Sequence, residues 1–180
     1  YPYGYANNAP TPENTLFQTF SEIMVKENNY DNIISSGLYP ASGTSDDWFY
    51  GEQTTKGKIY SMTPEIGSSF WPAQSDIIPL AKENIHMHLM NAKLALPYAA
   101  VKSESRYFVT TSFFHYVYYI QRLGLDGNGD FTVSITPLTP SIASTGAANT
   151  HNGLTMLQTQ TDSISVVLSS SVQQGDDISF

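Results

Sequence analysis

The segment LYPASGTSDDWFYG, residues 38–51, combines turn-forming residues, two adjacent carboxylates and large aromatic side chains. Proline, glycine and acidic residues are typical of a solvated loop. Tyr39, Trp48 and Tyr50, however, are too large and apolar to be left in water without a reason. The segment is therefore either a loop with local apolar contacts or one wall of a binding site.

The composition limits the classes of protein to which the chain can belong. At 180 residues it can form one large domain or two small ones. A hydrophobic content of 41% with only 13% charged residues argues against disorder. A net charge of −8, with Arg106 and Arg122 as its two arginines, argues against a nucleic-acid partner. Cysteine is absent, which excludes disulfides and thiol catalysis, and no apolar run reaches the roughly 18–20 residues of a membrane span.

Both ends of the sequence resemble cuts through folded structure. The chain opens on YPYGYANNAP and closes on GDDISF, which has a strand-like alternation. We expect the chain to be a piece of a longer protein.

The N-terminal half has helical patterns. Residues 11–29 predict a helix in which Thr11 is the N-cap and Pro12 takes the first position. Its apolar residues recur at helical spacing and form one stripe: Leu16, Phe20, Ile23 and Met24. A short strand is predicted at 59–62, and a second helix begins around residues 76–79 and runs to about residue 95.

The C-terminal half has strand patterns. From Arg106 onward, segments rich in Val, Ile, Thr, Tyr and Phe alternate with Gly, Asn and Asp clusters. We therefore predict an α/β region at 1–97, a linker at 98–105 and an all-β, sandwich-like module at 106–180, which could itself be truncated. Phe114, Tyr116 and Tyr118 are interpreted as one face of a strand rather than a ligand platform.

Three patterns that could carry chemistry favour a structural interpretation. His86 and His88 point to different sides of the predicted helix, and neither His115 nor His151 has a partner at metal-ligand spacing. The sequence DGNGD, residues 126–130, resembles the start of a calcium loop, but Pro137 takes the place of the required glutamate, so a hairpin turn is the preferred interpretation. No nucleophile elbow or base accompanies the serines.

Glu65 is the remaining candidate. It follows Thr63 and Pro64 at the end of the predicted short strand, among mostly apolar neighbours. A carboxylate in a dry pocket would have a raised pKa and could act as a general base. A solvent-facing glutamate at a strand end is the alternative.

Four stretches, in order, resemble the C-terminal half of a zinc carboxypeptidase of the carboxypeptidase A/B family, bacterial type. They are YPYGY (1–5), LYPASGTSDDWFYG (38–51), YSMTPEIG (60–67) and FWPAQSDIIPLAKEN (70–84). The resemblance covers roughly residues 1–95. It implies an α/β fold in which this chain supplies the C-terminal part of a mixed, mostly parallel twisted sheet flanked by helices, with an appended β-rich module.

The resemblance also implies the activity. Members of this family remove single residues from the C-terminus of peptides and proteins, using a zinc-activated water and a glutamate as general base. Glu65 stands at the position of that glutamate.

The resemblance implies a role for each substrate-binding position. Tyr39 matches a mobile tyrosine that closes over the substrate, and Asp46 falls at the base of the pocket for the departing side chain, where a carboxylate favours Lys or Arg. Ile34, Ala41 and Thr63 match pocket-wall positions, and Phe70 matches an aromatic beside the site. Asp47 and Trp48 are expected to brace the loop.

The zinc ligands of the family would precede Tyr1. We therefore expect zinc to be held by the N-terminal half of the same catalytic domain, and this chain alone to be inactive. The alternative is a catalytically inactive relative that binds a partner through its β-module. Family habit and the acidic, cysteine-free composition predict a secreted or periplasmic protein.

Overall fold

Helix α1 (Asn14–Met24) forms where the apolar stripe predicts it, in a computed structural model that describes residues 1–7, 9–103 and 108–180. The buried face of the helix includes Leu16, Phe17 and Phe20. The ring of Phe17 stacks on Tyr1, with ring centroids 5.7 Å apart, and meets Tyr50 edge-on at 5.1 Å. The helix is shorter than the predicted 11–29, and Glu13, not Thr11, is its N-cap. The backbone N–H of Asn14, the first helical residue, bonds to the carbonyl of Thr11, which closes a separate turn before the helix begins.

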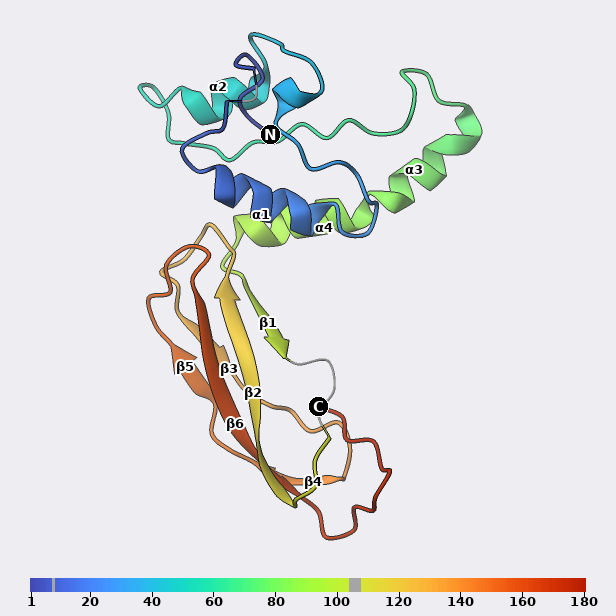
Figure 1. The fold of residues 1–180 in the computed structure, drawn as a ribbon, viewed down its shortest axis with the longest axis vertical. Helices are drawn as coiled ribbons and strands as arrows, with labels where there is room; N and C mark the ends of the chain where they lie inside the picture. The colour runs from blue at the N-terminus through green and yellow to red at the C-terminus, as the bar shows by residue number, and fades with distance from the viewer. Residues whose placement is uncertain (8, 104–107) are drawn as a thin grey trace. The chain divides into compact units, whose positions relative to one another are not determined.

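The chain divides into two units, Tyr1–Ala92 and Lys93–Phe180, each with its own core. After α1, the first unit contains short helices joined by long loops (Figure 1). They are η1 (Ser35–Gly37), α2 (Ser45–Gly51), η2 (Gln74–Asp76), α3 (Ile77–Glu83) and α4 (Ile85–Ala95), the last of which runs past the division.

The second helix predicted from the sequence is broken in two at Asn84. This residue is only 2% exposed, and its side-chain amide donates to the carbonyl of Leu80 at 2.8 Å. Its side-chain oxygen accepts from Asn28 Nδ2 at 2.9 Å. An asparagine side chain that competes for backbone groups favours helix ends over helix interiors.

The predicted mixed, mostly parallel sheet is wrong. All strand pairs among the described residues are antiparallel, and the first strand of the described chain begins at Ala99. The strand expected at 59–62 is an irregular segment, in which Ile59 donates to Phe49 and Ser61 donates back to Ile59. A parallel strand needs a neighbour on the far side of a long crossover, and the described residues before Ala99 supply none.

The second unit contains two antiparallel sheets. Their strands are β1 (Ala99–Ser103), β2 (Phe113–Arg122), β3 (Phe131–Val133), β4 (Ile142–Thr145), β5 (Asn149–His151) and β6 (Thr159–Leu168). The larger sheet has the order β1-β2-β6-β4, and β3 pairs with β5 (Figure 1). The central pair β2 and β6 is in register from Phe113–Val167 to Gln121–Thr159.

The core of the second unit explains the alternation in β2. Tyr118, Ile120 and Ile164 are nearly fully buried together with Leu154, and Tyr116 packs against them. Tyr116 and Tyr118 therefore lie on one inward face of the strand, as predicted for structural aromatics.

The predicted linker is partly a strand. Residues 99–103 pair with β2 from Ala99–Arg122 to Ser103–Tyr118. The last residues of that linker and the first of the predicted module, 104–107, lie outside the described residues.

The DGNGD segment is a turn, but the hairpin prediction is wrong, because it joins β2 to β3 in the other sheet. Arg122 organises it by donating from Nη1 to the carbonyl of Leu154 and from Nη2 to that of Gly127, both at 2.8 Å. Asp130 accepts from the backbone N–H of Gly153 at 2.7 Å. The Arg122 guanidinium therefore hydrogen-bonds backbone carbonyl oxygens, a type of group that calcium ions also bind.

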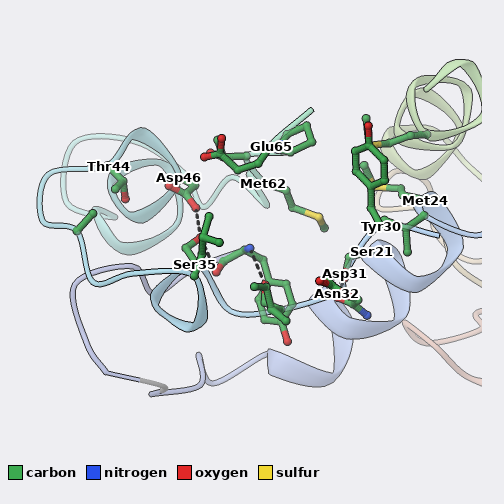
Figure 2. A pocket seen from close by; sticks show the side chains of 18 of the residues that line it. Ser21, Met24, Tyr30, Asp31, Asn32, Ser35, Thr44, Asp46, Met62 and Glu65 are labelled. Carbon is green, nitrogen blue, oxygen red and sulfur yellow. Dashed lines mark hydrogen bonds between the residues drawn. The ribbon is translucent and has the colours of Figure 1, made fainter. Parts of the chain in front are cut away.

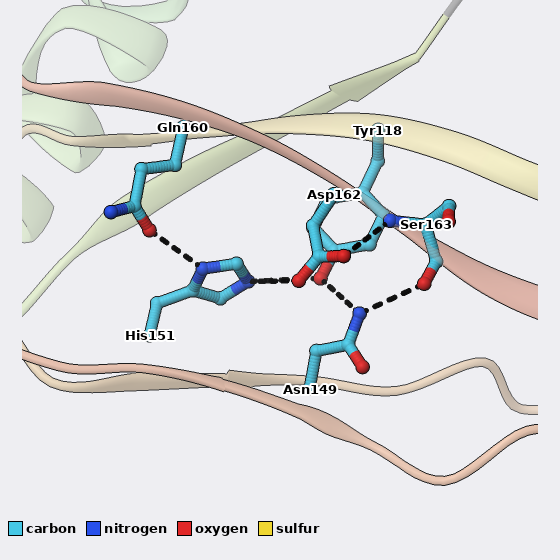
Figure 3. Close-up of polar contacts among 6 residues, drawn as sticks. All are labelled: Tyr118, Asn149, His151, Gln160, Asp162 and Ser163. Carbon is cyan, nitrogen blue, oxygen red and sulfur yellow. Dashed lines mark hydrogen bonds and ion pairs between the residues drawn. The ribbon is translucent and has the colours of Figure 1, made fainter.

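His151 is buried at the end of β5. Its Nδ1 lies 2.9 Å from Gln160 Oε1, and its Nε2 lies 2.9 Å from the hydroxyl of Tyr118 (Figure 3). Asn149 donates to the same hydroxyl and to the carbonyl of Ser163. Burial raises the pKa of Tyr118, and the nearby Asp162 adds to this effect against the hydrogen bond from Asn149. This cluster ties β5 to β2 and β6.

Glu13 anchors a polar cluster beside the aromatic core of the first unit. Its carboxylate accepts from the hydroxyls of Tyr50 and Tyr60 and from Lys58 Nζ, each at 2.7 Å. Burial acts to raise the pKa of Glu13, but these three donors together outweigh it and lower the pKa. Burial and the contact with Glu13 also raise the pKa of Tyr50 to about 12.

The Glu13 cluster predicts a pH-dependent contribution to stability. A carboxylate whose folded pKa is lowered stabilises the fold above its unfolded pKa, near 4.3, and loses that effect as the pH falls through the folded value. We expect Glu13→Gln to lower the free energy of unfolding by about 1 kcal/mol at pH 7, since these are hydrogen bonds to a partly exposed charge. The deficit should shrink below pH 4. Urea unfolding at pH 7 and pH 3.5 measures it, and an equal deficit at both pH values would contradict this assignment.

Candidate functional site

A cavity of about 700 Å³ opens in the first unit, lined by residues of α1 and α2, by the chain segments between and after these helices, and by Tyr1 and Met87. Five of the residues predicted as site residues line it: Tyr39, Ala41, Asp46, Thr63 and Glu65. Asp46 and Glu65 lie toward one end of the view in Figure 2, and Tyr30 and Met24 toward the other. Residues that are up to 86 positions apart in the sequence, Tyr1 and Met87, thus line a single cavity.

Two predicted site residues do not line the cavity. Ile34 packs instead against the core formed by Tyr1, Phe17 and Tyr50. Its neighbour Ile33 faces the cavity, as expected in an extended segment, where successive side chains point to opposite sides. Phe70 is 96% exposed.

Asp46 is an almost fully buried carboxylate at the cavity wall. It lies in the first turn of α2, is 2% exposed, and accepts a hydrogen bond from Ser35 Oγ at 3.1 Å. The start of a helix favours a negative charge, although α2 is short. Asp46 therefore presents an acidic group to whatever enters the cavity.

Asp47 has a different task from its neighbour. Its two carboxylate oxygens accept from the backbone N–H of Gly4 at 2.8 and 3.0 Å, and one of them also accepts from Tyr5 at 3.2 Å. This contact ties α2 to the N-terminal segment. Trp48 is 53% exposed, and Lys56 Nζ lies 5.0 Å from its ring centroid. Of the two residues expected to brace the loop, Asp47 is therefore the one that makes the anchoring contacts.

Tyr39 and Glu65 lie at the accessible side of the cavity. Tyr39 is 59% exposed, and Gly43 in the same loop has a positive φ of 78° with no atom near its missing side chain. Glu65 is exposed, so the dry surroundings expected from its apolar sequence neighbours are not present around it. Both side chains are free to meet a bound molecule.

The sequence missed several cavity residues. Tyr30, Asp31 and Asn32 line the cavity, yet the sequence assigned no role to them, directly after the helix predicted at 11–29. Thr44, at the N-cap of α2, also faces the cavity, and within the described chain its buried hydroxyl has no hydrogen-bond partner. A tyrosine within a polar run is the one signal that could have indicated Tyr30.

The described residues contain no group of three or more His, Cys, Asp or Glu that could hold a metal ion. His86 Nε2 lies 3.0 Å from the carbonyl of Ile23, and the ring of His115 meets Phe113 edge-on. The residues described here therefore do not fit a zinc site. In the same part of the chain, no helix has the length and apolar character needed to cross a bilayer.

Residues 1–87 match the family model of zinc carboxypeptidases. The match supports that family for this part of the chain. It contains the whole lining of the cavity, from Tyr1 to Met87. No curated protein and no solved structure matches the chain. The zinc carboxypeptidase match ends before the strands of the second unit begin.

Proposed function

We propose that residues 1–87 form the substrate-side wall of a zinc carboxypeptidase that removes C-terminal residues from peptides and proteins. The observation that carries the proposal is the placement of Tyr39, Asp46 and Glu65 around one cavity within the matched region. Each of them stands where the sequence resemblance expects a substrate-binding or catalytic group. The alternative, an inactive relative that binds a partner through the β-rich second unit, gains no support from the fold or the comparisons.

The roles follow from the chemistry of each side chain. Glu65, an exposed carboxylate at the cavity, accepts the proton of the attacking water and returns it to the leaving amine. Tyr39 closes over the peptide and reduces its contact with water. Ala41 and Thr63 form part of the wall.

The family implies zinc, and the ligands for it would have to come from residues other than those that the structure describes. We therefore propose that the 180-residue chain binds peptide C-termini but hydrolyses them only together with a ligand-bearing segment. Release of the C-terminal residue by the zinc-loaded protein that contains this chain is the test of the function.

Asp46 favours a peptide that ends in Arg or Lys. A buried carboxylate at the cavity wall is stabilised by an incoming cation and disfavours an apolar side chain. We expect Asp46→Asn, which keeps the size of the side chain and an acceptor for Ser35, to reduce the preference for an Arg over a Phe C-terminus by about tenfold. NMR titration of the chain with N-acetyl dipeptides ending in Arg or Phe measures the preference through the amide of Ala41.

Glu22→Gln on the exposed side of α1 is the matched control, because it removes the same charge away from the cavity. A chain that prefers Phe over Arg would contradict the role of Asp46. So would an Asp46→Asn variant with the unaltered preference.

A further inference from the structure

The segment that carries Glu65 belongs to no helix or strand. Within the described chain, no hydrogen bond holds the Glu65 side chain itself, so its position depends on the backbone around it. Two residues later, Gly67 donates its N–H to the hydroxyl of Tyr30 at 3.2 Å. Gly67 has a φ of +79°, and a Cβ atom there would lie 3.3 Å from the side chain of Leu80. Tyr30 and Leu80 thus hold the end of the segment.

The hydroxyl of Tyr30 is fixed by its other two contacts. It donates its proton to Glu83 Oε1 at 2.5 Å and accepts from Asn84 Nδ2 at 3.3 Å. Together with Gly67, these contacts use the one proton and both lone pairs of the hydroxyl. The hydroxyl therefore has a single arrangement that satisfies all three partners.

Asn84, which donates to the Tyr30 hydroxyl, is itself held in place by further hydrogen bonds. It is 2% exposed at the junction of α3 and α4, and both ends of its amide are engaged by Asn28 and Leu80. The contacts join three distant parts of the first unit: the loop after α1, the segment of Glu65 and the helix junction. The ring of Tyr30 lines the same cavity as Glu65 (Figure 2).

We propose that Tyr30 is a positioning residue for Glu65, acting through its hydrogen bond to Gly67. The inference rests on the proposed function of Glu65 as the proton acceptor. Between Glu65 and Gly67 there is only Ile66, and Pro64 restricts the backbone on the other side. Fixing Gly67 therefore restricts the directions in which the Glu65 carboxylate can point, which matters because a misplaced general base transfers protons slowly.

Tyr30→Phe tests the proposal, because it removes the hydroxyl and keeps the ring at the cavity. Tyr60→Phe is the matched control: it also removes one hydroxyl hydrogen bond, to Glu13, from a residue near the same segment. Hydrogen exchange of the Gly67 amide, measured by NMR on the 180-residue chain and referred to the amides of α1, is the first readout. We expect Tyr30→Phe to accelerate exchange at Gly67 by about tenfold, the effect of losing one hydrogen bond, and Tyr60→Phe to leave it unchanged.

The second readout is peptide hydrolysis by the zinc-loaded protein that contains this chain. We expect Tyr30→Phe to lower kcat by about tenfold with KM unchanged, since the base and not the binding of the peptide is affected. Should Tyr30→Phe not fold, Glu83→Ala removes the acceptor of the Tyr30 proton at an exposed contact, and exchange at Gly67 should still rise.

Unchanged exchange at Gly67, or unchanged kcat with faster exchange, would overturn the positioning role and leave the proposed function standing. Full hydrolysis by a Glu65→Gln variant would instead overturn the proposed function, whatever the exchange at Gly67. The two failures are therefore distinguishable.

Discussion

Replacing Glu65 by Gln lowers kcat for release of a C-terminal residue by about 10³-fold, if the carboxylate is the proton acceptor of the reaction. Gln has the same shape and polarity but cannot take a proton, and general base catalysis contributes roughly 10²–10⁴-fold. Because Glu65 is exposed and, among the described residues, makes no hydrogen bond, the substitution should leave the stability of the first unit unchanged. The measurement is steady-state hydrolysis by the zinc-loaded protein that contains this chain, with unfolding monitored in parallel.

Glu22→Gln is the control for Glu65→Gln, since Glu22 is an exposed glutamate on α1 and loses the same charge. Its kcat should match that of the unaltered protein. A Glu65→Gln protein that retains more than about a tenth of the activity would exclude Glu65 as the base.

Gly129→Ala destabilises the second unit by about 3 kcal/mol or more. Gly129 has a φ of +84°, which costs a residue with a side chain about 1–2 kcal/mol. An added Cβ would also lie 2.2 Å from the carbonyl oxygen of Leu154 and 2.7 Å from its nitrogen, so backbone must move. Overpacking of this kind adds about 1–3 kcal/mol. Urea unfolding followed through the NMR amide signals of Ile120 and Val166, in the core strands, measures the loss.

Gly153→Ala separates the two causes. Gly153 also has a positive φ, of 65°, but no atom lies within 4 Å of the position of its missing side chain. It should therefore show only the conformational cost, about 1–2 kcal/mol. Equal losses for the two variants would mean that the close approach of Leu154 to Gly129 contributes nothing.

The local patterns of the first unit could be predicted from the sequence. The stripe of Leu16, Phe20 and Met24 predicts α1, because a helix buries residues at this spacing wherever it packs. The family resemblance led us to expect a bracing role for Asp47 and a place for Asp46 in the substrate pocket. The structure has Asp47 bonded to Gly4 and Asp46 in the cavity lining, and the substrate-binding role of Asp46 stays a prediction.

Features that depend on distant partners could not be predicted. The strand pattern at residues 59–62 does not determine which strand would pair with this segment. Among the described residues, the segment pairs with no strand. Turn chemistry in DGNGD predicts a reversal of the chain but not whether the next strand joins the same sheet. Tyr30 was missed because its contacts, Gly67 and Glu83, lie 37 and 53 positions away.

The exposure of Glu65 shows a further limit of sequence interpretation. Apolar neighbours in the sequence suggested a dry pocket, but Thr63, Pro64 and Ile66 are themselves exposed. Adjacent residues in an extended segment point to opposite sides, so they do not determine the surroundings of the residue between them. The cavity itself is formed by segments that are far apart in the chain.

Mass spectrometry of a peptide digest tests the central claim most directly. Two synthetic peptides of one sequence ending in Arg, one with a free terminal carboxylate and one amidated, are incubated with the zinc-loaded protein that contains this chain. We predict stepwise loss of the C-terminal Arg from the free peptide and no cleavage of the amidated peptide. Cleavage within both peptides, or no release of Arg from the free peptide, would contradict the assignment of residues 1–87 to the substrate side of a zinc carboxypeptidase.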